Sequence, residues 1–124
     1  MARRRWYQKN KDLSKAYTKE WRHKNRDRAN VTARECHARL KDEVISAYGG
    51  VCQCCGESNR WFLTIDHINN DGAEHRRQLG GTRNCGVSYK LYSWLRKNNF
   101  PKDRFQLLCY NCNCGKDKNG GVCP

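Results

Sequence analysis

Two cysteine pairs, each with the spacing Cys-x-x-Cys, are the feature of this sequence that most constrains its fold. Cys52 and Cys55 form the first pair, and Cys109 and Cys112 form the second. A closed tetrahedral zinc site needs four thiolates, and two such pairs separated by a long insert supply them. Gly56 follows the first pair, where the backbone has to turn beneath the sulfur atoms. The sequence therefore predicts a structural zinc that joins two distant segments of the chain.

Other cysteines leave the ligand set open. The chain has 9 cysteines, and Cys54, Cys114 and Cys123 could each replace one of the predicted ligands. The odd count favours metal ligation over disulfides, and so does an N-terminus that leads into polar sequence without a signal peptide. No apolar run approaches the length of a membrane span. We therefore expect a cytoplasmic protein that contacts no membrane, in the cytoplasm of the host cell if a phage encodes it.

The size of the chain explains why a metal is needed. Only 37% of its 124 residues are hydrophobic, so the buried core must be small. Chains of this kind usually need a metal, disulfides or a partner to hold their fold. Zinc is the stabilising element that this sequence offers.

The second informative stretch ends in the pair Asp66–His67. An alternating apolar run predicts a strand over residues 61–65, and an Asn/Asp/Gly-rich turn follows the pair. Residues 105–108 predict a second strand, which the zinc would hold beside residues 63–66. Asp66, His67 and Asn113 could then meet at one place.

These three side chains suit phosphodiester hydrolysis. The carboxylate of Asp66 and the amide oxygen of Asn113 are hard ligands for Mg²⁺ or Mn²⁺, which also binds phosphate. A neutral imidazole such as His67 can take a proton from an attacking water near neutral pH. For an isolated Asp-His pair, the alternative is a hydrogen-bonded histidine at a strand end with an aspartate that caps the turn.

Charge indicates a polyanionic partner. The net charge is +13, and residues 1–50 carry 14 Lys and Arg against 6 Asp and Glu, which is +8 of that excess. We expect a helix in the first part of this stretch, and two roles for it are open. Its apolar face docks on the core, or the helix lies along a nucleic-acid backbone. A second helix would begin near Asn30 or Thr32 and end at Gly49–Gly50. The apolar face of the first helix consists of Trp6, Leu13, Tyr17 and Trp21.

The remaining segments predict a polar, basic surface loop over residues 72–81 and a helix over residues 88–97. A short helix or turn follows Cys109 and Cys112.

Three motifs in fixed order resemble the HNH endonucleases, especially the small phage and mobile-element type that includes homing endonucleases. They are Cys-x-x-Cys, Leu-Thr-Ile-Asp-His-Ile and Leu-Leu-Cys-Tyr-Asn-Cys-Asn-Cys-Gly-Lys, within residues 48–124. The resemblance implies a ββα-metal site braced by a four-cysteine zinc. It implies that Asp66 and Asn113 hold a catalytic Mg²⁺ or Mn²⁺ and that His67 is the general base. Lys116 matches a lysine of the last helix, and we expect it to contact phosphate.

One position departs from the pattern of that family. Arg104 stands where the family has an asparagine that orients the catalytic histidine. Because a guanidinium cannot accept a hydrogen bond, we expect His67 to be held by a backbone carbonyl or by Asn69, Asn70 or His75.

We therefore expect an α+β fold in which residues 1–48 are a basic helical DNA-binding arm and residues 49–124 an HNH nuclease domain. The expected activity is metal-dependent hydrolysis of double-stranded DNA, one strand at a time for a monomer. A homodimer and a phage DNA-packaging partner remain open. The alternatives are a zinc-stabilised nucleic-acid-binding module without catalysis and an RNA-directed nuclease. The residues expected to contact nucleic acid are Arg3, Arg4, Arg5, Lys15, Lys19, Arg22, Arg76, Arg77 and Lys116.

Overall fold

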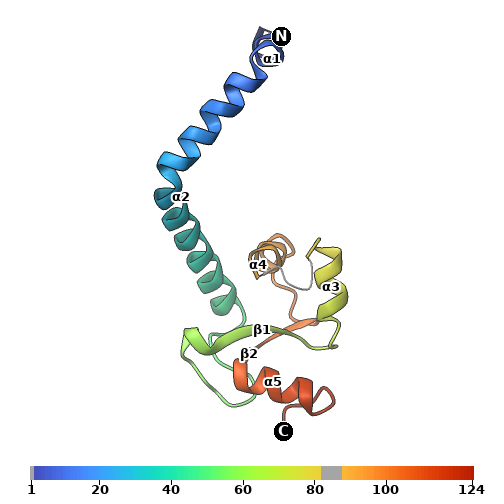
Figure 1. Ribbon diagram of the computed structural model, residues 1–124. Helices are drawn as coiled ribbons and strands as arrows, with labels where there is room; N and C mark the ends of the chain where they lie inside the picture. The colour runs from blue at the N-terminus through green and yellow to red at the C-terminus, as the bar shows by residue number, and fades with distance from the viewer. Residues whose placement is uncertain (1, 82–87) are drawn as a thin grey trace. The chain divides into compact units, whose positions relative to one another are not determined.

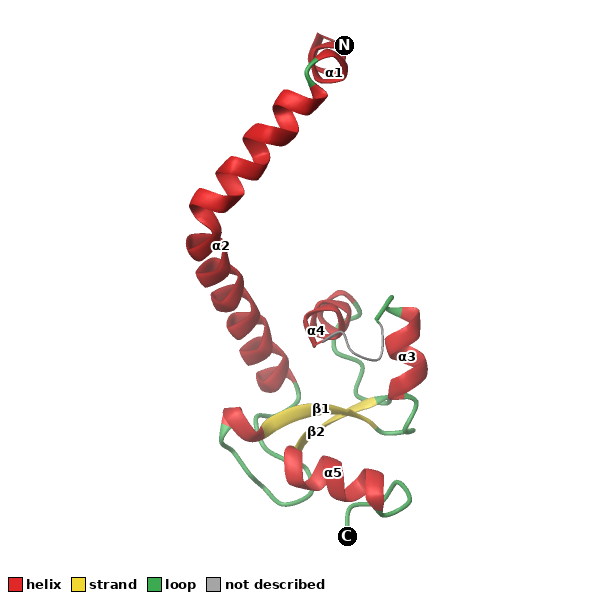
Figure 2. Cartoon of the chain, in the orientation of Figure 1, coloured by secondary structure: helices red, strands yellow, loops and turns green. Residues whose placement is uncertain are grey.

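Figure 1 shows the computed structural model of the chain, which describes residues 2–81 and 88–124, with side chains from residue 4 onward. The described residues form helices and a small sheet, as expected for a mixed α+β fold (Figure 2). The elements are α1 (Ala2–Lys9), α2 (Lys11–Ala47), the 3₁₀ helix η1 (Arg60–Phe62), β1 (Leu63–His67), α3 (Gly72–Gln78), α4 (Ser88–Lys97), β2 (Phe105–Cys109) and α5 (Tyr110–Lys118).

The chain divides into two compact units, Met1–Cys36 and His37–Pro124. The second unit begins earlier than the expected boundary at residues 48/49. The physical reason is that the last turns of α2 bury Leu40, Val44 and Ile45 in the core of that unit. These turns therefore belong to the unit that contains the four cysteines.

β1 and β2 form an antiparallel pair inside the second unit. Leu63 lies opposite Cys109 and His67 lies opposite Phe105, so the strands are aligned over their full length. α5 starts directly after β2 and contacts both strands. Figure 1 shows α5 on one side of the sheet and α3 and α4 on the other. Because β1 ends in the Asp66–His67 pair, this pair comes out at one end of the sheet.

The core of the second unit is small and includes three of the predicted zinc ligands. Its largest fully buried side chains come from both strands, α4 and α2, and the Cys52 turn closes it. The buried hydrophobic residues are Leu40, Val44, Ile45, Tyr48, Cys52, Leu63, Ile65, Leu95, Phe105, Leu107, Leu108, Cys109 and Cys112.

The first unit has no core of its own among its described side chains. Residues 4–36 are all exposed or half-buried. The predicted aromatic face is exposed, with 70% of Tyr17 and 53% of Trp21 accessible. No helix in the described ranges is long and apolar enough to cross a membrane.

The second helix expected to begin near Asn30 or Thr32 does not start there. α2 is continuous through both residues, and the Thr32 hydroxyl donates to the carbonyl of Arg28 at 3.0 Å. The break between α1 and α2 lies at Asn10, whose side-chain amide donates to the carbonyl of Trp6 at 2.9 Å. The predicted end of the helix is confirmed, because Gly49 and Gly50 follow Ala47 with positive φ values of 97° and 73°.

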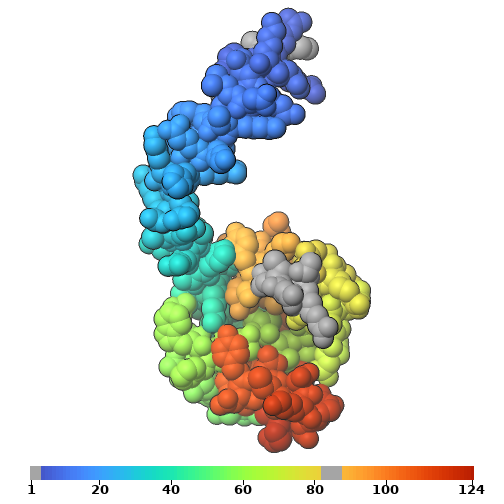
Figure 3. Space-filling view, viewed as in Figure 1, coloured from blue at the N-terminus to red at the C-terminus, as the bar shows by residue number. Residues whose placement is uncertain are grey.

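Two predictions were also wrong in the second unit. The strand expected over residues 61–65 begins at Leu63, because residues 60–62 form a 3₁₀ turn capped by the side chain of Asn59. The loop expected over residues 72–81 contains α3, which buries His75 on its inner side. The helix over residues 88–97 is confirmed as α4. The C-terminal residues follow α5 on the surface of this unit (Figure 3).

The core predicts a large difference between two apolar truncations. Leu107→Ala removes a side chain with 0% exposure, and should lower the free energy of unfolding of the zinc-loaded protein by about 2–5 kcal/mol. Trp61→Ala is the control, because Trp61 is 68% exposed and its loss should cost about 0.5 kcal/mol or less. Urea denaturation at equilibrium measures both. Equal losses in the two variants would contradict the placement of the core.

Candidate metal centre and adjoining cavity

The four predicted zinc ligands converge. The sulfur atoms of Cys52, Cys55, Cys109 and Cys112 all lie within 4.8 Å of one another. The Sγ atoms of Cys55 and Cys109 are 3.7 Å apart. Tetrahedral zinc with Zn–S bonds of about 2.3 Å separates its sulfur ligands by about 3.8 Å. These four cysteines could therefore hold a metal ion such as zinc with little rearrangement.

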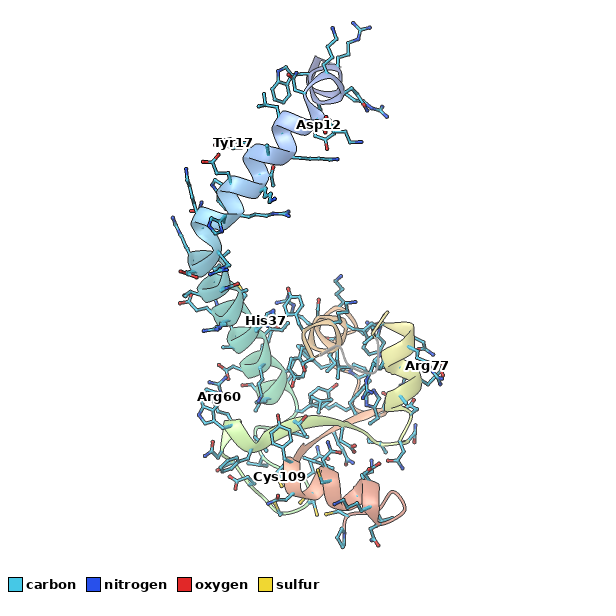
Figure 4. All side chains as sticks on the ribbon, in the orientation of Figure 1. Asp12, Tyr17, His37, Arg60, Arg77 and Cys109 are labelled. Atoms are coloured by element: carbon cyan, nitrogen blue, oxygen red, sulfur yellow. The ribbon has the colours of Figure 1, made fainter. Side chains whose placement is uncertain are left out.

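Backbone hydrogen bonds build this site from the two ends. The Gly56 N–H donates to the carbonyl of Cys52 at 2.9 Å and closes the first turn. The Gln53 N–H donates to the carbonyl of Leu107 at 2.9 Å, which ties that turn to β2. At the other end Cys109 is the N-cap of α5, and its sulfur accepts from the Cys112 N–H at 3.4 Å. Figure 4 labels Cys109 at this junction of β2 and α5.

The electrostatics of the four sulfur atoms call for a cation. Burial raises the pKa of Cys52, but backbone N–H groups of Cys55, Cys109 and Cys54 outweigh it and lower the pKa to about 6. The neighbouring sulfur of Cys109, followed by burial, raises the pKa of Cys112. One thiolate therefore forms readily and hinders the next. A divalent cation removes this conflict, because it stabilises all four thiolates at once.

A cavity of about 810 Å³ opens beside the end of the sheet. Asp66 and His67 from β1 and Asn113 from α5 all line it, as does Arg76 from α3. The sequence predicted that Asp66, His67 and Asn113 would meet, and the structure brings them to one cavity. The pairing of β1 with β2, followed at once by α5, explains why residues that are far apart in sequence share it.

Asp66 is 8% exposed and holds two partners through one oxygen. Its Oδ2 accepts from Lys116 Nζ at 2.6 Å and from Gln106 Nε2 at 2.8 Å. The other oxygen, Oδ1, is therefore the one that suits an ion. Oδ1 together with the amide oxygen of Asn113 is a donor set of the kind Mg²⁺ or Mn²⁺ prefers, and the cavity has room for water and phosphate.

Lys116 is buried, although the sequence predicted that its side chain would contact phosphate. It is 5% exposed, and its ammonium group also donates to the backbone carbonyls of His67 at 2.8 Å and Ile68 at 3.3 Å. All three donors of the ammonium group thus have acceptors inside the protein. This geometry does not support the expected phosphate contact. Lys116 instead fastens the end of β1 to α5.

His67 is held by a second histidine. Its Nε2 lies 2.9 Å from Nδ1 of His75, which was one of the partners that the sequence left open. His75 is 3% exposed and packs edge-on against Trp94, with ring centroids 4.6 Å apart. Phe105 lies against both imidazoles, at 4.7 Å from His67 and 5.6 Å from His75. His75 therefore fixes the orientation of His67.

The hydrogen bond also limits which nitrogen of His67 can act as a base. Nε2 is bound to His75, so Nδ1 is the nitrogen that can accept a proton. Nδ1 lies so close to Gly72 that a Cβ at that position would come within 3.1 Å of it. For Nδ1 to act as the base, Nε2 must carry the proton and donate to His75 Nδ1, and His75 must then carry its own proton on Nε2. His75 Nε2 is buried without a hydrogen-bond partner, and this lowers the stability of the folded protein.

Both imidazoles stay neutral near neutral pH. Burial is the largest cause that lowers the pKa of His67 below 6.5, and the charge of His75 adds to it against the carboxylates of Asp71 and Asp66. Burial also lowers the pKa of His75, helped by the guanidinium of Arg104. A neutral His67 is the form that a general base requires.

The side chain of Arg104 contacts Asp71 and Trp94. Its guanidinium lies 3.4 Å from Asp71 Oδ2 and 5.8 Å from the ring centre of Trp94. Its backbone carbonyl accepts from the Ile68 N–H at 2.9 Å. The arginine thus holds the turn that follows β1.

The predicted nucleic-acid contacts have different surroundings. Arg76 is exposed at the cavity, whereas the guanidinium of Arg77 is bound to the carboxylate of Glu74. Arg3 belongs to α1, but its side chain lies outside the described residues. In the first unit, the side chains of Arg4, Arg5, Lys15, Lys19 and Arg22 are all exposed.

Sequence reasoning gave no role to Gln106. Only the pairing of the two strands shows that Gln106 is near the site, because it places Gln106 opposite Asp66. Tyr92 and Asp117 also line the cavity and were not singled out.

Comparisons with protein-family models, with curated proteins and with solved structures give no match to this chain.

The cysteine cluster predicts one zinc ion per chain. Cys109→Ser should abolish stoichiometric zinc binding and unfold the second unit, because the site joins two segments of its core. Cys114→Ser is the control, because Cys114 is exposed and lies outside the four-sulfur set. Native mass spectrometry counts the metal, and circular dichroism follows folding with and without a chelator. A folded, zinc-free Cys109→Ser protein would refute the assignment.

The lowered histidine pKa values predict that stability depends on pH. A histidine with a lower pKa in the folded state binds fewer protons there, so the free energy of unfolding is highest above pH 6.5 and falls as the pH drops through that value. Denaturation with zinc in excess should show this fall, and His75→Leu should weaken it. NMR titration should place both midpoints below 6.5. A midpoint above 6.5 for His67 or His75 would contradict the burial argument.

Proposed function

We propose that the protein is a metal-dependent DNA endonuclease of the HNH type. One observation carries the proposal: Asp66, His67 and Asn113 line a single cavity, and His67 is oriented there by His75 at 2.9 Å. The three motifs that resemble the HNH endonucleases supply these same residues. The four-cysteine cluster supports the proposal, because it accounts for the pairing of the two strands that bear the site.

The residues divide the work of hydrolysis. Asp66 and Asn113 would hold Mg²⁺ or Mn²⁺, which when bound neutralises charge on the phosphate and on the leaving oxygen. His67 accepts a proton at Nδ1 from the attacking water, because its Nε2 is already committed to His75. His75 keeps the ring in place and in one tautomer during this transfer. Burial by Phe105 and Trp94 keeps competing water away from the histidine pair.

The charge distribution favours a nucleic acid as the substrate, and we propose double-stranded DNA. The chain carries a net charge of +13, and the first unit presents Lys15, Lys19 and Arg22 in exposed positions on one helix. Such cations bind phosphates by releasing counterions, so affinity should fall with salt and depend little on sequence. A single site cuts one strand, so we propose nicking as the primary activity.

The Asp66–Lys116 pair favours a second candidate function, a zinc-stabilised nucleic-acid-binding module without catalysis. Lys116 lies 2.6 Å from Asp66 Oδ2 and neutralises the carboxylate that should attract the ion. An Asp66 with this partner binds a divalent cation more weakly than a lone carboxylate would. Binding to DNA would then be the whole function.

Conversion of supercoiled plasmid by the zinc-loaded protein separates the two functions. With Mg²⁺ or Mn²⁺ the wild type should produce open-circular DNA. His67→Ala should reduce the rate by about 10²–10⁴-fold, the usual contribution of a general base. A gel-shift assay of the zinc-loaded protein without added Mg²⁺ or Mn²⁺ should show unchanged DNA binding by the variant, because His67 is not among the predicted phosphate contacts.

His37→Ala is the matched control, because His37 stacks on Tyr89 at 4.5 Å and lines no part of the cavity. It should cleave as the wild type does. Wild-type protein that shifts DNA but leaves it intact in every metal would favour the binding module. Cleavage that survives His67→Ala would refute His67 as the base. Parallel assays with RNA test the substrate class.

A further inference from the structure

A second cysteine pair lies beside the zinc cluster and takes no part in it. The Sγ atoms of Cys54 and Cys123 are 2.9 Å apart, although 69 positions separate these residues in the sequence. Cys54 is exposed and Cys123 is half-buried. A cavity of about 350 Å³ opens beside both, so small solutes reach the two sulfur atoms.

The geometry of this pair suits a covalent bond better than a metal. The group that contains both sulfurs has one further thiol, Cys112, which already belongs to the four-cysteine set. A closed structural zinc site needs four ligands at sulfur separations of about 3.8 Å. The 2.9 Å separation is shorter than that, and a disulfide bond of about 2.0 Å requires only these two sulfurs to approach.

We propose that Cys54 and Cys123 form a reversible disulfide when the zinc-loaded protein meets a hydroperoxide. One thiolate attacks a peroxide oxygen, the O–O bond breaks, and the sulfur becomes a sulfenic acid as water or an alcohol leaves. The second thiol attacks this sulfur, the S–S bond forms, the S–O bond breaks, and water leaves. Two thiols lose two electrons in all, and one peroxide is reduced.

The bond fastens the C-terminal segment, residues 119–124, to the first zinc turn. Without it, this segment is held by backbone bonds to α5, such as Gly121 N–H to the carbonyl of Lys116 at 2.8 Å. Gly121 also lies against the side chain of Asn70, and Asn70 lines the large cavity. The segment lies at the surface (Figure 3), where an oxidant finds it. Oxidation thus fixes a segment that borders the candidate site. This inference does not depend on the function proposed for that site.

Peptide mapping of the full zinc-loaded chain tests the proposal. The protein is treated with hydrogen peroxide, its remaining thiols are alkylated, and trypsin cleaves after Lys118. Residues 119–124 should then stay attached to the peptide that contains Cys54, with a mass lower by two hydrogen atoms. Dithiothreitol should release them. Native mass spectrometry of the oxidised chain, before alkylation, should still show one zinc ion per chain.

Three variants make the result specific. Cys54→Ser and Cys123→Ser should each abolish the linked peptide and still bind one zinc, whereas Cys114→Ser, at another exposed cysteine, should leave the link intact. Two zinc ions in the wild type and one in Cys54→Ser would show a second metal site and overturn the proposal. Loss of all zinc from Cys54→Ser would show that Cys54 is a ligand of the main site. Zinc release before any Cys54–Cys123 link forms would overturn it as well.

Discussion

The clustering of four cysteine sulfurs is the constraint on which the rest of the second unit depends. Cys52 and Cys55 lie in a turn, and Cys109 and Cys112 lie where β2 becomes α5, so the cluster joins the start and the end of the unit. The core between them is small, and two strands of five residues would pair only marginally in isolation. A bound cation would hold the ends of that pair together. The cavity depends on the cluster, because β1 and α5 supply Asp66, His67 and Asn113 to it.

Two buried polar contacts then set the chemistry of the cavity. The Asp66–Lys116 pair fixes the end of β1 against α5, and removing one partner of such a pair costs about 3–5 kcal/mol. The His67–His75 pair fixes the imidazole that faces the cavity. The first contact stabilises the geometry but weakens the pull of Asp66 on a cation. The second fixes the orientation of the His67 imidazole, whose pKa burial lowers. The two proposed functions therefore rest on different contacts. The His67–His75 contact supports a nuclease, and the Asp66–Lys116 contact supports a binding module.

The His67–His75 pair also shows which residue orients His67 in this structure. Arg104 occupies the place of an asparagine in the HNH pattern, and its side chain pairs with Asp71. The orienting contact comes instead from α3, a short helix that begins at Gly72. Glycine at that position leaves room for the ring of His67, because a Cβ there would crowd its Nδ1 at 3.1 Å.

The sequence by itself determined the four cysteines, the strand that ends in Asp66–His67, the helix over residues 88–97 and the excess of positive charge. Each of these rests on local spacing or composition, which the residues specify directly. Only the tertiary structure decided the helix α3, the partner of His67 and the burial of Lys116. A seven-residue helix that starts with glycine has too weak a local preference to be predicted, and its burial of His75 stabilises it. From the sequence alone, Lys116 is predicted to contact phosphate. In the folded protein, strand pairing places three oxygen acceptors around its ammonium group.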